Sequence, residues 1–598
     1  DVRGALAFPK KNYQVILKLA QYELDRRNLE EAEQLYLALL LYGYFDGNIA
    51  KGLSEIARFR FDFAAAAEIS RVGAAYSNAW KLAEGVMLQT QYSALARDFA
   101  GTVEGFAVAG ISNPGLLGRF IGDSIADVPH YLGVLPYTNA LLASIMAASA
   151  GTPISRAQAL VAMNAPAEAE NLLKAYAPVS SEVEKYTLTR VQACRLLERY
   201  DDARQQISRL VAILPTAIVY SEALRAAIDS HDYAWGEQLL AEAVARGLDI
   251  GEVFHRRIGK GVTDLKKIFL SHRLIKSSGL LRKYFGDKYV QSLSLLGSTA
   301  TSTNVVIAYF GPGDEIRFAS LYSEMKAACG ASRVKFTCDP RLLKLFQRSY
   351  PELEFHPVQR VRSLTWLQDY RSFDRLPGSD LFRHVDNAGL DLIQSADNII
   401  LQLDALGDVV EGFHTFRGVP YLRPDVEKVS AWKDKLSGID GKFLVGLCWR
   451  SSLNTPVRSS GYLTTDALAP LFALPGVVYV SLQYGEHAEE LEQINRLYPN
   501  RLLTFQDLDT FNDLDGMAAL MVCLDAVIAP ATTVAELAGS LGCTTLMFSS
   551  SSQNNWRELA SDSLDLWHRS MRHVNVENKL ALPQVLADRL LYELTGDA

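Results

Sequence analysis

The chain has 598 residues, of which 49% are hydrophobic and 21% charged, and its formal net charge is −8. This length predicts three or four domains, and the mildly acidic balance argues against a nucleic-acid-binding protein. The six cysteines form no CxxC pair, which favours reduced core residues of a cytoplasmic protein over a disulfide framework or a zinc site.

The first 250 residues have helical apolar spacing and a recurring small residue. Ala66 follows Ala32 by 34 residues, Ala203 follows Ala169 by 34, and Gly236 follows Ala203 by 33. Three positions before each small residue stands a side chain suited to filling a turn; these are Leu29, Phe63, Pro166, Tyr200 and Tyr233. The period resembles that of the tetratricopeptide repeat (TPR), so residues 1–250 are predicted to form a TPR-like helical solenoid.

Within this half, residues 75–155 keep the helical pattern but lose the repeat signature. We interpret them as degenerate repeats or a helical insert. The uncharged stretch 131–151 contains a proline and Asn139, so a pair of buried helices is a better interpretation than a membrane span.

A basic stretch separates the two halves. Between Arg256 and Lys288 the sequence has ten Lys or Arg residues and only two Asp. We predict a basic helical linker over 251–303. Its charge suits phosphates or peripheral association with an anionic membrane surface, and the simpler alternative is a solvated helix face between domains.

From residue 304 onward, short strands rich in Val, Ile and Phe alternate with helices. Strands are expected at 305–310, 334–337, 443–449, 477–483, 501–505, 525–529 and 544–548, and helices at 315–328, 340–349, 463–474, 486–498, 515–523 and 532–541. Such alternation predicts parallel sheets covered on both faces. A break near 420–440 divides this half into 304–430 and 431–598, so the predicted fold class is α plus α/β, a helical solenoid followed by two doubly wound Rossmann-like domains.

Four short motifs occur in order along the α/β half. They are GPGDEIRF at 311–318, WR at 449–450, LQ at 482–483 and APATTVAEL at 529–537. With the repeats before them, the stretches 305–348 and 443–545 resemble bacterial TPR glycosyltransferases, which are related to the heptosyltransferases of lipopolysaccharide synthesis. That resemblance implies the two-domain GT-B fold, with 304–430 on the acceptor side and 431–598 binding the donor.

The resemblance assigns the catalytic base to Asp314. In the related heptosyltransferases the aspartate of the GD turn takes the acceptor's proton, whereas the simpler role is a charge in the first turn of a helix. Gly311 and Gly313 would let a ligand approach the backbone. Glu315 is expected to complement the helix dipole.

Donor binding is expected at the ends of the later strands. Trp449 and Arg450 end one strand, and Arg450 is predicted to bind the donor's phosphate, with Arg458 as a second candidate and a surface salt bridge as the alternative. Gln483 would bind the base or ribose, or would simply be a solvated strand end.

Thr532 and Thr533 are predicted to begin a helix whose N-terminus binds an anion, a placement that also suits an ordinary N-cap. Ala531 and Glu536 stand where relatives usually have Asp and His, which points to an altered donor or reduced activity; Glu536 is retained as a donor-site candidate. The acidic loop 507–515 is interpreted as nucleotide-proximal or capping, because its spacing matches no metal loop.

The sequence therefore predicts an inverting, metal-independent glycosyltransferase without a cofactor, which takes its sugar from a nucleotide donor such as a UDP- or CMP-linked sugar. The favoured acceptor is a protein recruited by the repeats, flagellin or another surface protein. Two alternatives stay open: a surface polysaccharide or lipid-linked acceptor, and an inactive scaffold that binds partners through its repeats.

Overall fold

The computed structural model describes most of the chain in several segments. These are residues 13–26, 28–41, 43–60, 62–75, 89, 153–162, 165–230, 232–248, 265–271, 276–296, 299–360, 370–439, 443–452, 461–485, 487–549, 557–558, 563–576 and 579–596. The chain divides into two compact units. The first comprises Asp1–Ala203, Arg360–Ala388 and Thr455–Val457, and the second comprises Arg204–Gln359, Gly389–Asn454 and Arg458–Ala598. The finer boundaries at 250, 303 and 430 remain predictions.

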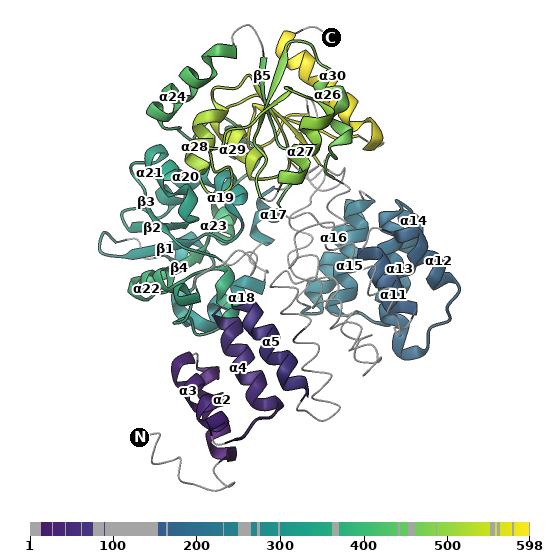
Figure 1. Cartoon of the computed structure of the whole chain (residues 1–598), viewed down its shortest axis with the longest axis vertical. Helices are drawn as coiled ribbons and strands as arrows, with labels where there is room; N and C mark the ends of the chain where they lie inside the picture. The colour runs from purple at the N-terminus through teal and green to yellow at the C-terminus, as the bar shows by residue number, and fades with distance from the viewer. Residues whose placement is uncertain are drawn as a thin grey trace. The chain divides into compact units, whose positions relative to one another are not determined.

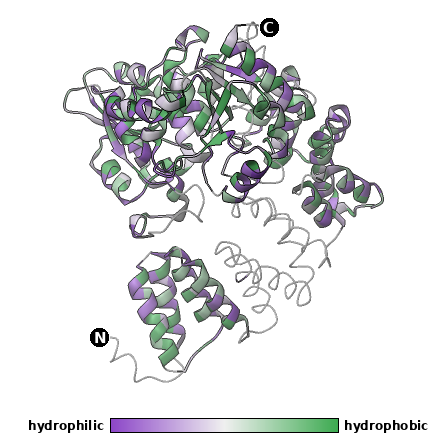
Figure 2. Ribbon diagram, turned by 45° about the horizontal axis from the view of Figure 1, so that its top comes forward, coloured by the Kyte–Doolittle hydropathy of each residue, from purple (hydrophilic) through white to green (hydrophobic). Residues whose placement is uncertain are grey.

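Helical hairpins occupy the N-terminal part of the chain (Figure 1). The first unit contains α2 (Tyr13–Asp25), α3 (Leu29–Leu41), α4 (Gly47–Phe59), α5 (Phe63–Ala75), α11 (Pro153–Ala162), α12 (Pro166–Lys174) and α13 (Val183–Leu196). The helix α14 (Tyr200–Ile213) begins in the first unit and ends in the second. In the second unit the pattern continues with α15 (Ala217–Asp229) and α16 (Tyr233–Ala245). Figure 2 shows hydrophilic and hydrophobic residues along each of the helices α2 to α5, as expected for helices with one face buried.

The small residues of the repeat lie where the sequence predicts close packing. Ala32, Ala66, Ala169 and Ala203 are 0% exposed, and Gly236 is buried. Each turn-filling residue is the first residue of the helix that contains the small residue; these helices are α3, α5, α12, α14 and α16. The repeat pattern is therefore confirmed in the described hairpins.

Two sequence interpretations fall outside the described residues. The stretch without the repeat signature is described only at its two ends and at residue 89, and 131–151 is not described. Among the helices that are described, none has the length and apolar character needed to cross a membrane.

The first parallel sheet lies in the second unit. It consists of β1 (Thr303–Ile307), β2 (Arg333–Cys338), β3 (Glu354–Pro357) and β4 (Asn398–Leu401), in the order β3-β2-β1-β4. Its neighbours along the chain are α17 (Leu265–Ser271), α18 (Lys276–Phe285), α19 (Pro312–Ala319), α20 (Tyr322–Ala328), α21 (Leu343–Ser349), α22 (Asn387–Ser395) and α23 (Gln402–Val409). The single helix predicted over 315–328 is wrong in one respect, because α19 ends at Ala319 and α20 begins at Tyr322.

The second sheet also belongs to this unit and is parallel throughout. Its strands are β5 (Phe443–Leu447), β6 (Val477–Ser481), β7 (Leu502–Leu503), β8 (Ala526–Pro530), β9 (Thr545–Phe548) and β10 (Met571–Val574), in the order β10-β9-β8-β5-β6-β7. The helices are α24 (Val426–Leu436), α26 (Ala469–Phe472), α27 (Ala488–Leu497), α28 (Leu514–Met521), α29 (Thr533–Leu541) and α30 (Leu582–Thr595). The predicted class, helical repeats followed by two doubly wound α/β sheets, is confirmed.

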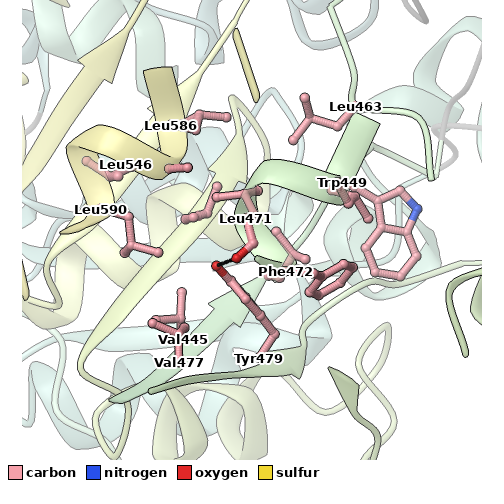
Figure 3. Close-up of a cluster of buried hydrophobic side chains, with 14 of the residues drawn as sticks. Val445, Trp449, Leu463, Leu471, Phe472, Val477, Tyr479, Leu546, Leu586 and Leu590 are labelled. Carbon is pink, nitrogen blue, oxygen red and sulfur yellow. Dashed lines mark hydrogen bonds between the residues drawn. The ribbon is translucent and has the colours of Figure 1, made fainter. Parts of the chain in front are cut away.

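A continuous apolar core fixes the second sheet (Figure 3). Val445 from β5 and Leu546 from β9 are 0% exposed, as are Leu586 and Leu590 from α30. The hydroxyl of Tyr479 on β6 donates a hydrogen bond of 2.7 Å to the backbone carbonyl of a residue in α26. Burial of apolar surface stabilises the folded chain by about 25 cal/mol per Å². This core therefore holds the strands in place, and with them the residues that follow the strand ends.

Candidate functional site

Each sheet has one point where the strand order reverses. In the first sheet the chain runs from β1 outward to β2 and β3 and then returns to place β4 on the other side of β1. In the second sheet it runs from β5 to β6 and β7 and then returns to place β8 beside β5. Open α/β sheets bind ligands at the carboxyl ends of strands at such reversals. Asp314 follows β1, Arg450 follows β5 and Thr532 follows β8, so all three lie at these points.

The helices that follow β1 and β8 meet at their first turns. A Cβ atom added to Gly313 of α19 would lie 3.2 Å from Cα and 3.3 Å from the backbone nitrogen of Thr533, the first residue of α29. Any side chain at Gly313 would therefore push the two helices apart. Gly311 differs, because an added Cβ would meet nothing within 4 Å and its φ of −74° suits any residue.

Asp314 is in the first turn of α19, where its charge complements the helix dipole. Its side chain is 36% exposed and pairs with the guanidinium of Arg317, one turn further along the same helix. The neighbouring Glu315 is 0% exposed, and its carboxylate accepts a hydrogen bond of 2.9 Å from the backbone N–H of Asp339. Asp314 is thus the accessible carboxylate of this turn, and Glu315 ties α19 to the segment after β2.

Thr532 occupies the N-cap position of α29 without capping it. Its hydroxyl donates to the carbonyl of Pro530 at 3.2 Å, and its side chain accepts no hydrogen bond from the helix. The first-turn N–H groups of α29 therefore have no side-chain cap from Thr532. Uncapped N–H groups at the positive end of a helix dipole can bind an anion. Ala531, immediately before them, is exposed.

Arg450 is buried rather than exposed on the surface, with 8% of the residue accessible. Its Nε lies 2.7 Å and 2.9 Å from the two carboxylate oxygens of Glu490 on α27. Arg450 therefore forms a salt bridge, as the alternative interpretation expected, but the arginine is buried and not on the surface. Phosphate binding by Arg450 would require exchange of Glu490 for the phosphate and stays a prediction.

Gln483 is 0% exposed and holds the ends of β5 and β6 together. Its amide oxygen accepts the backbone N–H groups of Trp449 and Arg450 at 3.0 and 3.1 Å, and its amide nitrogen donates to the carbonyl of Arg450 at 2.9 Å. The solvated-strand-end interpretation of Gln483 is wrong. Trp449 is also 0% exposed and belongs to the core of the second sheet, and Arg458 lies outside the described residues.

Glu536 is the centre of a buried network of charges. Its carboxylate accepts hydrogen bonds from Arg557 at 2.6 and 3.2 Å, from Arg317 at 3.2 Å and from His568 at 3.0 Å. Burial raises the pKa of Glu536, but the charges of Arg557 and Arg317 and the contact with His568 outweigh burial and lower it to about 2. Glu536 is therefore ionised and held by its own protein, and contact with a donor stays a prediction.

The network extends from Glu536 into the C-terminal segment. Arg557 is 1% exposed, and its Nε lies 2.9 Å from the carboxylate of Asp565. Asp565 accepts the backbone N–H groups of Trp567 and His568 at 2.9 and 3.1 Å. Burial opposes ionisation of Asp565, but Arg557 and His573 hold its pKa well below the usual range.

A small cavity lies beside the N-terminus of α29. Arg341, Tyr484, Phe511 and Thr533 are among the residues that line it, and its volume is about 30 Å³. Arg341 is fixed there by Asp339 at 2.8 Å and by the carbonyl of Phe511 at 3.1 Å. This volume accommodates only a few water molecules, so a nucleotide would need a wider opening.

The acidic loop is used for capping and ion pairing. Asp513 caps α28 by accepting the N–H of Gly516 at 2.8 Å, and Asp507 pairs with Lys435 at 2.6 Å. Asp515 pairs with Arg348 at 2.7 Å. Among the residues with described positions, no group of three His, Cys, Asp or Glu side chains is arranged to hold a metal ion.

Two arginines of this site are missed by the sequence interpretation. Arg317 lies inside the GPGDEIRF motif, three residues after Asp314, where a helix brings the two side chains together. That spacing could have identified it. Arg557 lies in a region without a local pattern, and its role depends on Glu536, 21 residues earlier.

Comparison with known proteins gives limited matches. No family model matches the chain. Protein FlbA of Caulobacter vibrioides is 26% identical over 270 residues, which cover 44% of this chain and 41% of FlbA. The chain thus spans less than half the length of that curated relative.

Solved structures similar to this chain include three glycosyltransferases. E. coli ADP-heptose LPS heptosyltransferase II is 12% identical with a TM-score of 0.33, and the match covers 49% of this chain and 98% of that one. The glycosyl transferase family 9 protein from Veillonella parvula is 11% identical with a TM-score of 0.34, covering 50% and 99%. A Thermobaculum terrenum O-GlcNAc transferase is 11% identical with a TM-score of 0.28, covering 86% and 93%. At these TM-scores the likeness carries no argument, and the fold is assigned from the chain's own sheets and helices.

Proposed function

We propose that the chain is an inverting glycosyltransferase that moves a sugar from a nucleotide-sugar donor to a protein acceptor. The observation that supports this is the meeting of two first turns at Gly313 and Thr533, one after each strand-order reversal. This arrangement brings a partly exposed carboxylate, Asp314, and an uncapped helix N-terminus to the same place.

Each part has a chemical task in such a transfer. Asp314 would accept the proton of the acceptor's hydroxyl as it attacks the sugar. The N–H groups at the start of α29 would stabilise the charge that develops on the leaving phosphate. Arg450 would add a guanidinium to the phosphate if it exchanged Glu490 for the donor. No cofactor or metal is part of this proposal.

The acceptor is proposed from the helical hairpins. Repeated hairpins with buried small residues at a fixed spacing form extended surfaces suited to recruiting another protein. Flagellin is the candidate that the sequence resemblance indicates, and the cytoplasm is the proposed compartment.

Nucleotide binding and transfer test this proposal in two steps. The chain is melted with UDP, ADP, GDP and CMP separately, and a nucleotide at about 100 times its dissociation constant should stabilise it by about 2.7 kcal/mol. It is then incubated with flagellin from its own organism and the sugar donor of the stabilising nucleotide. A mass increase of one sugar on flagellin supports the proposal, whereas no stabilisation by any nucleotide contradicts it.

An inactive scaffold is the second candidate. It is favoured by the internal partners of Arg450 and Glu536, whose charges are engaged by Glu490 and Arg557. A scaffold would bind flagellin through its helical hairpins with no response to any nucleotide. Binding of flagellin, together with a melting temperature that no nucleotide raises, would therefore favour this second candidate.

A further inference from the structure

Arg317 links the candidate base to the second sheet. Its guanidinium pairs with the carboxylate of Asp314 and, through Nη1, lies 3.2 Å from Oε1 of Glu536 on α29. Its side chain is 12% exposed, and the guanidinium carbon lies 5.0 Å from the ring centre of Phe318 and 5.8 Å from that of Trp567. Two carboxylates and two aromatic rings therefore fix the orientation of the guanidinium.

The anchor of Arg317 is itself rigid. Glu536 is held by Arg557 and His568, and Arg557 is held in turn by Asp565. Arg557 shares its single positive charge between Glu536 and Asp565. Arg317 supplies a second cation to Glu536 and also links this buried network to Asp314.

We propose that Arg317 is a positioning residue that holds the carboxylate of Asp314 in place, with Glu536 as its anchor. This inference rests on the proposed function, because it concerns how the base is placed for transfer. A partly exposed carboxylate on its own samples several rotamers, whereas an arginine fork restricts it to one geometry. Glu536, at a position where relatives usually have His, then serves to hold this arginine.

The first test needs no substrate. Asp314 is labelled with a carbodiimide and an amine, and its rate of modification is followed by peptide mass spectrometry in the full chain. Arg317→Gln should raise the rate several-fold, and Arg317→Lys should fall between this variant and the unsubstituted chain. Arg348→Gln is the matched control, because Arg348 makes a comparable ion pair with Asp515 at 2.7 Å and has no contact with Asp314 among those described. An unchanged rate in Arg317→Gln would overturn the proposal.

The second test is a double-mutant cycle on turnover. Release of free nucleotide is measured with UDP-N-acetylglucosamine, ADP-glucose, GDP-mannose and CMP-N-acetylneuraminate, with flagellin present. Arg317→Gln should lower kcat by about 10- to 100-fold, the scale expected when a reacting group is misplaced by about 1 Å, with little change in the Kd of the nucleotide. In the Asp314→Asn background the same substitution should have almost no further effect.

The outcomes separate the two proposals. Multiplicative losses in the double variant would mean that Arg317 acts independently of Asp314, which overturns the positioning role alone. Normal turnover in Asp314→Asn removes the base and, with it, the positioning role. If Arg317→Gln does not fold, Arg317→Lys takes its place in the cycle, since its ammonium keeps the charge but cannot span Asp314 and Glu536 together.

Discussion

The helical hairpins and the candidate site between the two α/β sheets bury different kinds of side chain. In the hairpins the repeat positions bury small side chains, and Ala32, Ala66 and Ala203 are 0% exposed. Near the candidate site charged side chains are buried as well, with those of Arg557 and Glu536 only 1% and 6% exposed.

The ion pairs of Arg557 with Glu536 and Asp565 differ from those of the hairpins, because both members of each pair are almost fully buried. In each described pair of the hairpins at least one side chain is partly exposed, as in Arg71–Glu68, where the exposed fractions are 54% and 60%. The buried Glu170 fits this rule because its partner Arg199 is 40% exposed. The hairpins should therefore tolerate loss of a charge but not a gain of volume, and the site should be sensitive to loss of a charge.

The largest stability effect is expected from Arg557. Arg557→Met should lower the free energy of unfolding by about 3–5 kcal/mol, because it leaves the carboxylates of Glu536 and Asp565 buried without their main cation. Arg71→Met is the matched control in the hairpins and should cost at most about 1 kcal/mol. Urea unfolding followed by circular dichroism measures both. If the two substitutions lowered the free energy of unfolding by the same amount, the ion pairs of the site and of the hairpins would not differ in their contribution to stability.

Acid should weaken the site through Glu536. The pKa of this residue falls from 4.5 to about 2 in the folded chain, so its contribution is fully present above about pH 4.5 and is lost as the pH falls toward about 2. A shift of this size corresponds to a contribution on the order of 3 kcal/mol at neutral pH. Glu536→Gln should therefore be less stable than the original chain at pH 7, and the difference should shrink on acidification. A difference that stays constant down to pH 3 would argue against this assignment.

A smaller effect is expected in the hairpins. Ala203→Leu on α14 adds three carbons at a position that is 0% exposed, and overpacking of this kind costs about 1–3 kcal/mol. Ala212→Leu on the exposed side of the same helix should change stability by less than about 0.5 kcal/mol. Thermal melts of the two variants provide the comparison, and similar melting temperatures would mean that the small residue of the repeat is not a packing constraint.

The hairpins can be predicted because their constraint repeats within a short window of sequence. The turn-filling residue and the small residue three positions later both lie in one helix, as with Tyr200 and Ala203 on α14. The main strands of both sheets are predictable for a similar reason, since each is a continuous apolar run. The strands β3, β4 and β10 are not among the predicted strands; each is four residues long and includes polar or charged residues such as Glu354, Asn398 and Arg572, whereas β9, of the same length, lies in a more apolar run.

The segment near 420–440, predicted to divide the α/β half, contains α24, and the boundary itself stays a prediction. Asp425 begins this helix by accepting the N–H groups of Glu427 and Lys428 at 3.0 and 3.1 Å. An aspartate after Pro424 is a recognisable start signal. The start of α24 can therefore be predicted from the sequence, but the glycines and the proline of the segment are equally typical of a break between domains.

At the site, the residues that follow strands can be predicted and the residues that hold them cannot. Asp314, Thr532 and Thr533 are predictable because a turn after an apolar strand has a local pattern. The link between Arg317 and Glu536 spans 219 residues. Such a pairing depends on how two sheets are placed together, which no local pattern encodes.

The most direct test of the proposed transfer is the Asp314→Asn substitution, assayed for melting temperature and for turnover with the donor that the nucleotide screen identifies. Asparagine keeps the shape of the side chain but cannot accept the acceptor's proton. Because the side chain is 36% exposed, the melting temperature should change little, while turnover should fall by about 10²- to 10⁴-fold. Normal turnover in Asp314→Asn would contradict the assignment of this carboxylate as the base.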